Sequence, residues 1–111
     1  PIPWYSVRGN MDHSLSNLPI SRVVNLAGKK IGMVHGWGGP DTLEQSVLNH
    51  FAGKHLDVIV FGHSHQPLCR KVGSVLLFNP GSATDRRKAA HHTVGILAFN
   101  DVVKGEIIPI D

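Results

Sequence analysis

Two histidines follow a short apolar segment and could bind a metal ion. Val58–Phe61 is an uninterrupted apolar run, and Gly62 separates it from His63, Ser64 and His65. In an extended loop, side chains two positions apart point to the same side, so both imidazoles could face one small volume. Imidazole is a common ligand of zinc and related divalent metals. The alternative is a turn in which one histidine is exposed and the other caps the backbone.

Polar side chains follow two other predicted strands in the same way. Trp4–Val7 leads into a turn with Asn10 and Asp12, where an amide oxygen could bind a divalent cation and a carboxylate could orient a ligand. The strand predicted over Lys30–His35 ends in His35, and the glycines that follow would let the backbone approach a ligand closely. Each has a plainer alternative, namely a simple turn around Asn10 and a buried, hydrogen-bonded His35.

The elements that must position these side chains are predicted from the apolar pattern. The run Val58–Phe61 suits a strand covered on both faces, which is typical of an α/β or layered sheet protein. Asp41 and Glu44 form a capping-box pattern at the start of an amphipathic helix that Gly53 ends. Three antiparallel hairpins are predicted around these elements, Ser21–Leu26 with Lys30–His35, Leu68–Val72 with Ser74–Phe78, and Thr93–Phe99 with Lys104–Ile110.

Length and composition indicate one globular domain over residues 1–111. The 111 residues are 41% hydrophobic and 17% charged. No apolar run approaches the roughly 18 residues of a membrane helix, so we expect a soluble, cytoplasmic protein without a membrane partner. Cys69 is the single cysteine, and a metal site must therefore use histidine and oxygen ligands.

The net positive charge would suit a nucleic-acid partner, but the distribution of the positive residues makes such a partner a minor alternative. The net charge is +3 and the isoelectric point is about 9.4. The positive residues are scattered, and their one cluster, at residues 86–88, has no aromatic residues interleaved for base stacking.

The motifs become specific when they are taken together. Along the chain stand a Gly-Asn-x-Asp turn, an apolar strand ending in His-Gly, an apolar strand ending in Gly-His-x-His, and the segment Asn79-Pro80-Gly81-Ser82. This series resembles the calcineurin-like metallophosphoesterase superfamily, and within it the small bacterial and archaeal phosphodiesterases. The resemblance covers the chain from Trp4 to Asp111.

The resemblance implies a β-sandwich flanked by helices, with two divalent metals between the strand ends. Asn10, His35 and His63 would bind one metal, and His65 would bind its neighbour. Mn, Fe, Ni, Co and Zn all suit such ligands. Two metals about 3.5–4 Å apart can activate a hydroxide for in-line attack on phosphorus, so the implied reaction is hydrolysis of a small phosphodiester. Residues near the metals or the substrate would be Gly9, Asp12, Gly36, Trp37, Asn79 and Ser82.

The sequence departs from the family pattern in its first part. The family's Asp-x-His and Gly-Asp motifs, which supply the bridging carboxylate, are absent from it. We therefore expect the C-terminal two thirds of such an enzyme, inactive alone and completed by a missing N-terminal segment or by a second copy of the chain.

Two single positions also depart from the pattern. Met11 stands where phosphatase branches carry a proton-donating histidine, which favours the phosphodiesterase branch. Trp37 replaces a second histidine found in many members and could stack on a base or an aryl leaving group. The superfamily also includes a retromer subunit that serves as a protein-binding scaffold, and this function is the alternative.

Overall fold

The computed structural model describes residues 7, 19–39, 41–85, 87 and 89–110. The strand predicted over Trp4–Val7, apart from Val7, and the predicted turn with Gly9, Asn10 and Asp12 lie outside the described residues.

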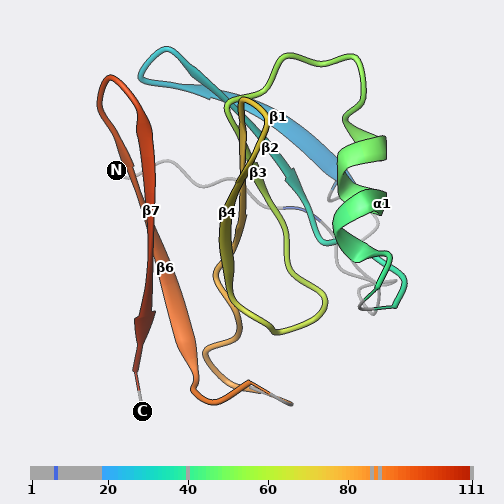
Figure 1. Cartoon of the computed structure of the whole chain (residues 1–111), viewed down its shortest axis with the longest axis vertical. Helices are drawn as coiled ribbons and strands as arrows, with labels where there is room; N and C mark the ends of the chain where they lie inside the picture. The colour runs from blue at the N-terminus through green and yellow to red at the C-terminus, as the bar shows by residue number, and fades with distance from the viewer. Residues whose placement is uncertain (1–6, 8–18, 40, 86, 88, 111) are drawn as a thin grey trace.

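A five-stranded mixed sheet forms the centre of the molecule (Figure 1). Its strand order is β1-β2-β3-β5-β4. β2, β3 and β5 run parallel, while β1 and β4 lie antiparallel to their neighbours at the two edges. The strands are β1 (Ser21–Leu26), β2 (Lys29–Val34), β3 (Val58–Val60), β4 (Leu68–Val72) and β5 (Val75–Asn79).

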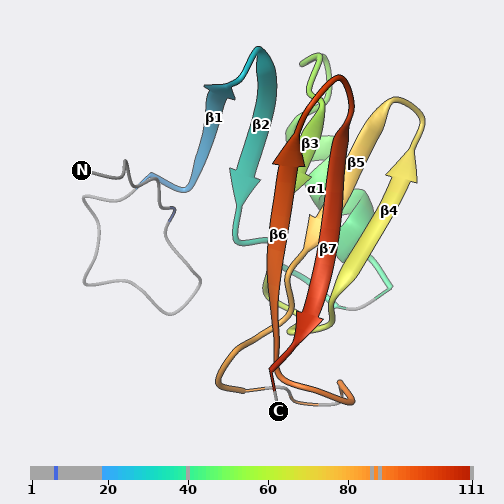
Figure 2. The same cartoon turned by 90° about the vertical axis from the view of Figure 1, so that its left-hand side faces the viewer.

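A two-stranded sheet covers one face of the central sheet, and a helix covers the other (Figures 1 and 2). The hairpin consists of β6 (Thr93–Phe99) and β7 (Val103–Pro109), and the helix α1 spans Leu43–His50. The three predicted hairpins are confirmed, and one strand of each is shifted by a single residue. Within the described part of the chain, α1 is the one helix, and no helix there is long and apolar enough to cross a membrane.

The strand β3 is buried on both faces, as its unbroken apolar sequence predicts. Val58 is 0% exposed and belongs to the cluster that meets the β6–β7 hairpin. Ile59 is 2% exposed and belongs to the cluster under α1. Because successive strand residues face opposite sides, two adjacent apolar side chains join β3 to both covering layers.

The helix α1 buries the predicted face but starts differently from the prediction. Leu43, Val47 and Phe51 are at most 4% exposed. The predicted capping box is wrong, because the N-cap residue is Thr42 and the structure shows no side-chain cap hydrogen bond there. Glu44 instead forms an ion pair with Arg70 of β4, which directs its carboxylate away from the helix terminus.

Candidate metal centre

His35 and His63 meet where two neighbouring parallel strands end. β2 ends at Val34, directly before His35, and β3 ends three residues before His63. The Gly62 amide donates to the His35 carbonyl at 2.9 Å, which joins the two strand ends. The two imidazole rings have centroids 5.4 Å apart and lie edge to face, at 75°. The carboxyl ends of parallel strands thus bring together two side chains that are 28 positions apart in the sequence.

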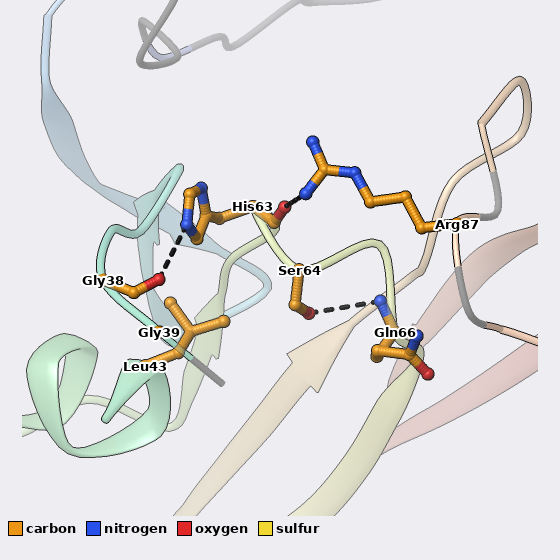
Figure 3. A pocket seen from close by; sticks show the side chains of 7 residues that line it. All are labelled: Gly38, Gly39, Leu43, His63, Ser64, Gln66 and Arg87. Carbon is orange, nitrogen blue, oxygen red and sulfur yellow. Dashed lines mark hydrogen bonds between the residues drawn. The ribbon is translucent and has the colours of Figure 1, made fainter. Parts of the chain in front are cut away.

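Main-chain carbonyl groups orient both rings. Nδ1 of His35 lies 3.1 Å from the Gly36 carbonyl oxygen, and Nε2 of His63 lies 2.9 Å from that of Gly38 (Figure 3). An imidazole that donates from one nitrogen carries its lone pair on the other, as a metal ligand requires. Two imidazoles on one tetrahedral zinc ion have centroids roughly 5 Å apart. The 5.4 Å spacing of the His35 and His63 rings is close to this value.

His65 points elsewhere in this structure. Its Nδ1 is hydrogen-bonded to the main-chain oxygen of Asp85 and lies 3.9 Å from the Asp85 carboxylate. The extended loop predicted for this segment is wrong, because His63 and His65 have φ angles of 70° and 61°. Residues with left-handed φ angles are not extended, so the alternation of side chains along a strand does not apply to this segment. Among the described residues, no group of three His, Cys, Asp or Glu side chains could hold a metal ion.

Asn79 joins the histidine loop to the segment that follows β5. Its side chain is 1% exposed. Nδ2 donates to the Gly62 carbonyl at 3.1 Å and to Ser64 Oγ at 3.2 Å, while Oδ1 accepts the Gly81 amide at 2.9 Å. All three partners belong to the protein itself, so Asn79 serves as a cross-link between two loops.

Ser82 has a similar structural role. Its Oγ accepts the amides of Thr84 and Asp85 at 3.3 and 3.0 Å, and its carbonyl accepts the Thr93 amide at 2.9 Å. The hydroxyl therefore shapes the loop that carries Asp85, the partner of His65.

Gly36 and Trp37 lie between the metal-binding candidates and the helix. Gly36 is buried, has φ of 95°, and leaves no room for a side chain, because a Cβ there would lie 2.7 Å from Leu43 Cδ1. Trp37 is 40% exposed, and its ring contacts that of His50 edge to face, with centroids 5.5 Å apart. Trp37 thus contacts the end of α1.

A cavity of about 270 Å³ opens beside His63 (Figure 3). The sequence analysis missed one of its residues, Arg87, whose guanidinium lies close to the main chain of His63. The basic cluster at residues 86–88 was the available signal, but sequence alone did not connect it to the histidines. The residues that line the cavity are Gly38, Gly39, Leu43, His63, Ser64, Gln66 and Arg87.

The model of the calcineurin-like phosphoesterase superfamily domain matches residues 2–102. The chain belongs to this superfamily. The match includes the region of Asn10, Asp12 and Gly9, which lies outside the described residues, and the ends of β2, β3 and β5. The fold predicted from the motifs is therefore confirmed.

Curated relatives are phosphoesterases. The chain is 33% identical over 109 residues to a probable metallophosphoesterase of Methanocaldococcus jannaschii, covering 96% of this chain and 54% of that protein. It is 32% identical over 106 residues to the phosphodiesterase YfcE of Escherichia coli K12, covering 88% of this chain and 53% of that protein. The chain thus spans about half the length of these relatives.

Solved structures share the fold. The structure of YfcE, described as a phosphoesterase, superimposes with a TM-score of 0.64 at 29% identity, covering 87% of this chain and 53% of that chain. Vps29 of Entamoeba histolytica, solved in complex with zinc, superimposes with a TM-score of 0.69 at 24% identity, covering 95% of this chain and 68% of that chain. The second similarity is evidence for the fold alone.

Proposed function

We propose that the protein hydrolyses small phosphodiesters with the help of divalent metal ions. His35 and His63, together with Asn10, would hold one ion, and His65 would bind a neighbouring ion after leaving the Asp85 carbonyl. The observation that carries the proposal is the edge-to-face pair of His35 and His63, 5.4 Å apart beside a cavity, in a chain of this superfamily. Mn, Fe, Ni, Co and Zn remain alternative metals for such ligands.

The residues of this chain would orient the reactants. The carbonyl groups of Gly36 and Gly38 fix the imidazole rings of His35 and His63, and such outer contacts strengthen metal ligands. Asn79 holds the His63 loop in place from β5. A divalent ion bound there would polarise a phosphoryl oxygen and lower the pKa of a bound water molecule.

The ligands proposed from this chain are electrically neutral. Three imidazoles and an amide do not offset the desolvation of a doubly charged ion as a carboxylate does. Carboxylate ligands, such as those of the family's Asp-x-His and Gly-Asp motifs, are therefore part of the proposed di-metal site. The 111 residues alone should bind at most one ion, weakly, and should be inactive. Two ions retained per 111-residue chain after dialysis, measured by mass spectrometry, would contradict this expectation.

The experiment for the catalytic proposal is an assay of the full-length protein with bis(p-nitrophenyl) phosphate. Mn, Fe, Ni, Co and Zn are added singly after chelation, and nitrophenolate release is followed. The variant His63→Ala should lose at least 100-fold in turnover, while the matched control His55→Ala, which alters an exposed histidine, should keep it. Absence of metal-dependent turnover across the series would reject the proposal.

A protein-binding scaffold of the same fold is the second candidate. The observation in its favour is that ring nitrogens of both His63 and His65 contact main-chain carbonyl oxygens. Calorimetric titration of the full-length protein with Zn and Mn separates the candidates. The scaffold function requires stable folding without metal and no turnover, whereas the enzyme requires both metal binding and turnover.

A further inference from the structure

Arg87 places a permanent positive charge at the cavity beside His63. Its Nη1 donates to the His63 carbonyl at 3.2 Å, and Figure 3 shows the side chain extending along the cavity toward His63. The Arg87 amide contacts Asp85 Oδ1 at 3.3 Å, and the residue has φ of 49°. Arg87 thus has left-handed backbone, and its side chain reaches the main chain of His63.

The guanidinium has donors to spare for a ligand. Arginine carries five N–H donors in a planar fork. Among the described residues, its side chain makes one hydrogen bond, to His63, and one longer contact, from Nε to Asp85 Oδ2 at 4.0 Å. The side chains of Arg87 and Asp85 are 52% and 64% exposed, and such surface ion pairs contribute little. Arg87 can therefore exchange this contact for an anionic ligand at small cost.

We propose that Arg87 binds the non-bridging phosphoryl oxygens of the substrate while the cavity accepts one of its two ester groups. This inference rests on the proposed phosphodiesterase function. The guanidinium fork matches two phosphoryl oxygens in geometry, and its charge complements the single negative charge of a diester. Because Arg87 contacts the main chain of His63, the bound phosphorus would lie next to the proposed metal ligands.

The cavity sets the size and polarity of the ester group. Its volume of about 270 Å³ lies just below the range of roughly 300–1,000 Å³ that is typical of ligand cavities. Leu43 gives it an apolar wall, and Ser64 and Gln66 give it polar ones. The substrate class is therefore a small phosphodiester with a compact, uncharged aromatic or aliphatic group, and a nucleic-acid strand does not fit this description.

The competing explanation is that Arg87 only ties its loop to the His63 carbonyl. A binding measurement without turnover separates these two explanations, because protein kept free of metal by a chelator can bind a diester that it does not hydrolyse. We would measure the dissociation constant of bis(p-nitrophenyl) phosphate by ligand-observed NMR in excess EDTA on the full-length protein. The variants are Arg87→Ala and Arg87→Lys, and the charge-matched control is Arg70→Ala, which removes an exposed arginine of β4.

The expected result is a loss of affinity of roughly 10- to 100-fold in Arg87→Ala, with partial rescue in Arg87→Lys and no change in Arg70→Ala. Melting temperatures should be equal in the two alanine variants. Dimethyl phosphate, whose methyl ester groups are too small to fill the cavity, should bind more weakly than bis(p-nitrophenyl) phosphate.

Three results of the comparisons between variants and between ligands would overturn the inference. They are undiminished affinity in Arg87→Ala, an equal loss in Arg70→Ala, or tighter binding of a short oligothymidylate than of the small diester. Undetectable binding by the unmodified protein would also overturn it. Arg87-dependent binding without metal-dependent turnover would reject only the catalytic proposal, so the two failures are distinguishable.

Discussion

Replacement of Asn79 by alanine should destabilise the protein and loosen the proposed metal centre. Asn79 is 1% exposed and connects β5 to both the histidine loop and the turn at Gly81. The loop that it holds contains His63 and His65, both with positive φ. A non-glycine residue in this conformation costs roughly 1–2 kcal/mol, which neighbouring contacts must offset.

The magnitude follows from the three hydrogen bonds that Asn79→Ala removes. Each contributes about 0.5–1.5 kcal/mol net, and a partner left without a bond in the interior costs more. Gly62, Ser64 and Gly81 are partly exposed, so water can reach some of the freed groups. We therefore expect a loss of about 2–4 kcal/mol in the free energy of unfolding. For a domain of this size, the melting temperature should fall by roughly 10–20 °C.

The assay is urea unfolding followed by circular dichroism, together with calorimetric titration of Zn into the full-length protein. The control is Asn49→Ala, which alters an exposed asparagine of α1 and should change the unfolding free energy by less than about 0.5 kcal/mol. Zn affinity should fall in Asn79→Ala and stay constant in the control. A loss of stability in Asn79→Ala no larger than that of Asn49→Ala would refute the cross-linking role.

Three further changes test other parts of the structure. Because His65 has φ of 61°, the free energy of unfolding of His65→Gly should exceed that of His65→Ala by roughly 1 kcal/mol, and His65→Gly should melt at the higher temperature. Both variants should lose turnover equally. Equal thermal stability of these variants would count against the left-handed turn. In Gly95→Ala, the new Cβ would lie 2.5 Å from Phe78 Cε2, so urea unfolding should show a loss of about 1–3 kcal/mol; an unchanged midpoint would contradict the packing. Within the part of the chain that the structure describes, β6 pairs with β7 alone and exposes Val94 and Ile96, and an exposed apolar strand edge invites pairing with a second chain. Ile96→Lys should therefore reduce any self-association of the 111-residue chain seen by light scattering. If the unmodified 111-residue chain is already a monomer, β6 does not cause self-association.

The element predictions succeeded where the apolar pattern is strong. Val58–Phe61 predicted a doubly covered strand, and β3 is buried on both faces. The start of α1 was missed, because Glu44 can serve either a capping box or a distant arginine and only the fold brings Arg70 beside it. The local sequence does not show whether Glu44 serves the helix start at Asp41, three positions away, or pairs with Arg70, 26 positions away.

The proposed site divides in the same way. His35 and His63 could be predicted as partners, because each follows an apolar strand and parallel strands end at one edge of a sheet. The partnership of Asp85 with His65 could not be predicted. It depends on left-handed backbone at His65, a conformation that no residue type in this segment signals.

The sequence by itself determined the superfamily and the layered fold, and it named the candidates for metal binding, because the residue types at strand ends and the apolar periodicity are features of the local sequence. Only the tertiary structure decided where those side chains point. Asn79 became a cross-link, Trp37 turned to His50, and Arg87 reached the main chain of His63. The physical reason is that a side chain's partner is set by the backbone dihedral angles and by the packing of segments that are distant in the chain, and neither is encoded in a motif.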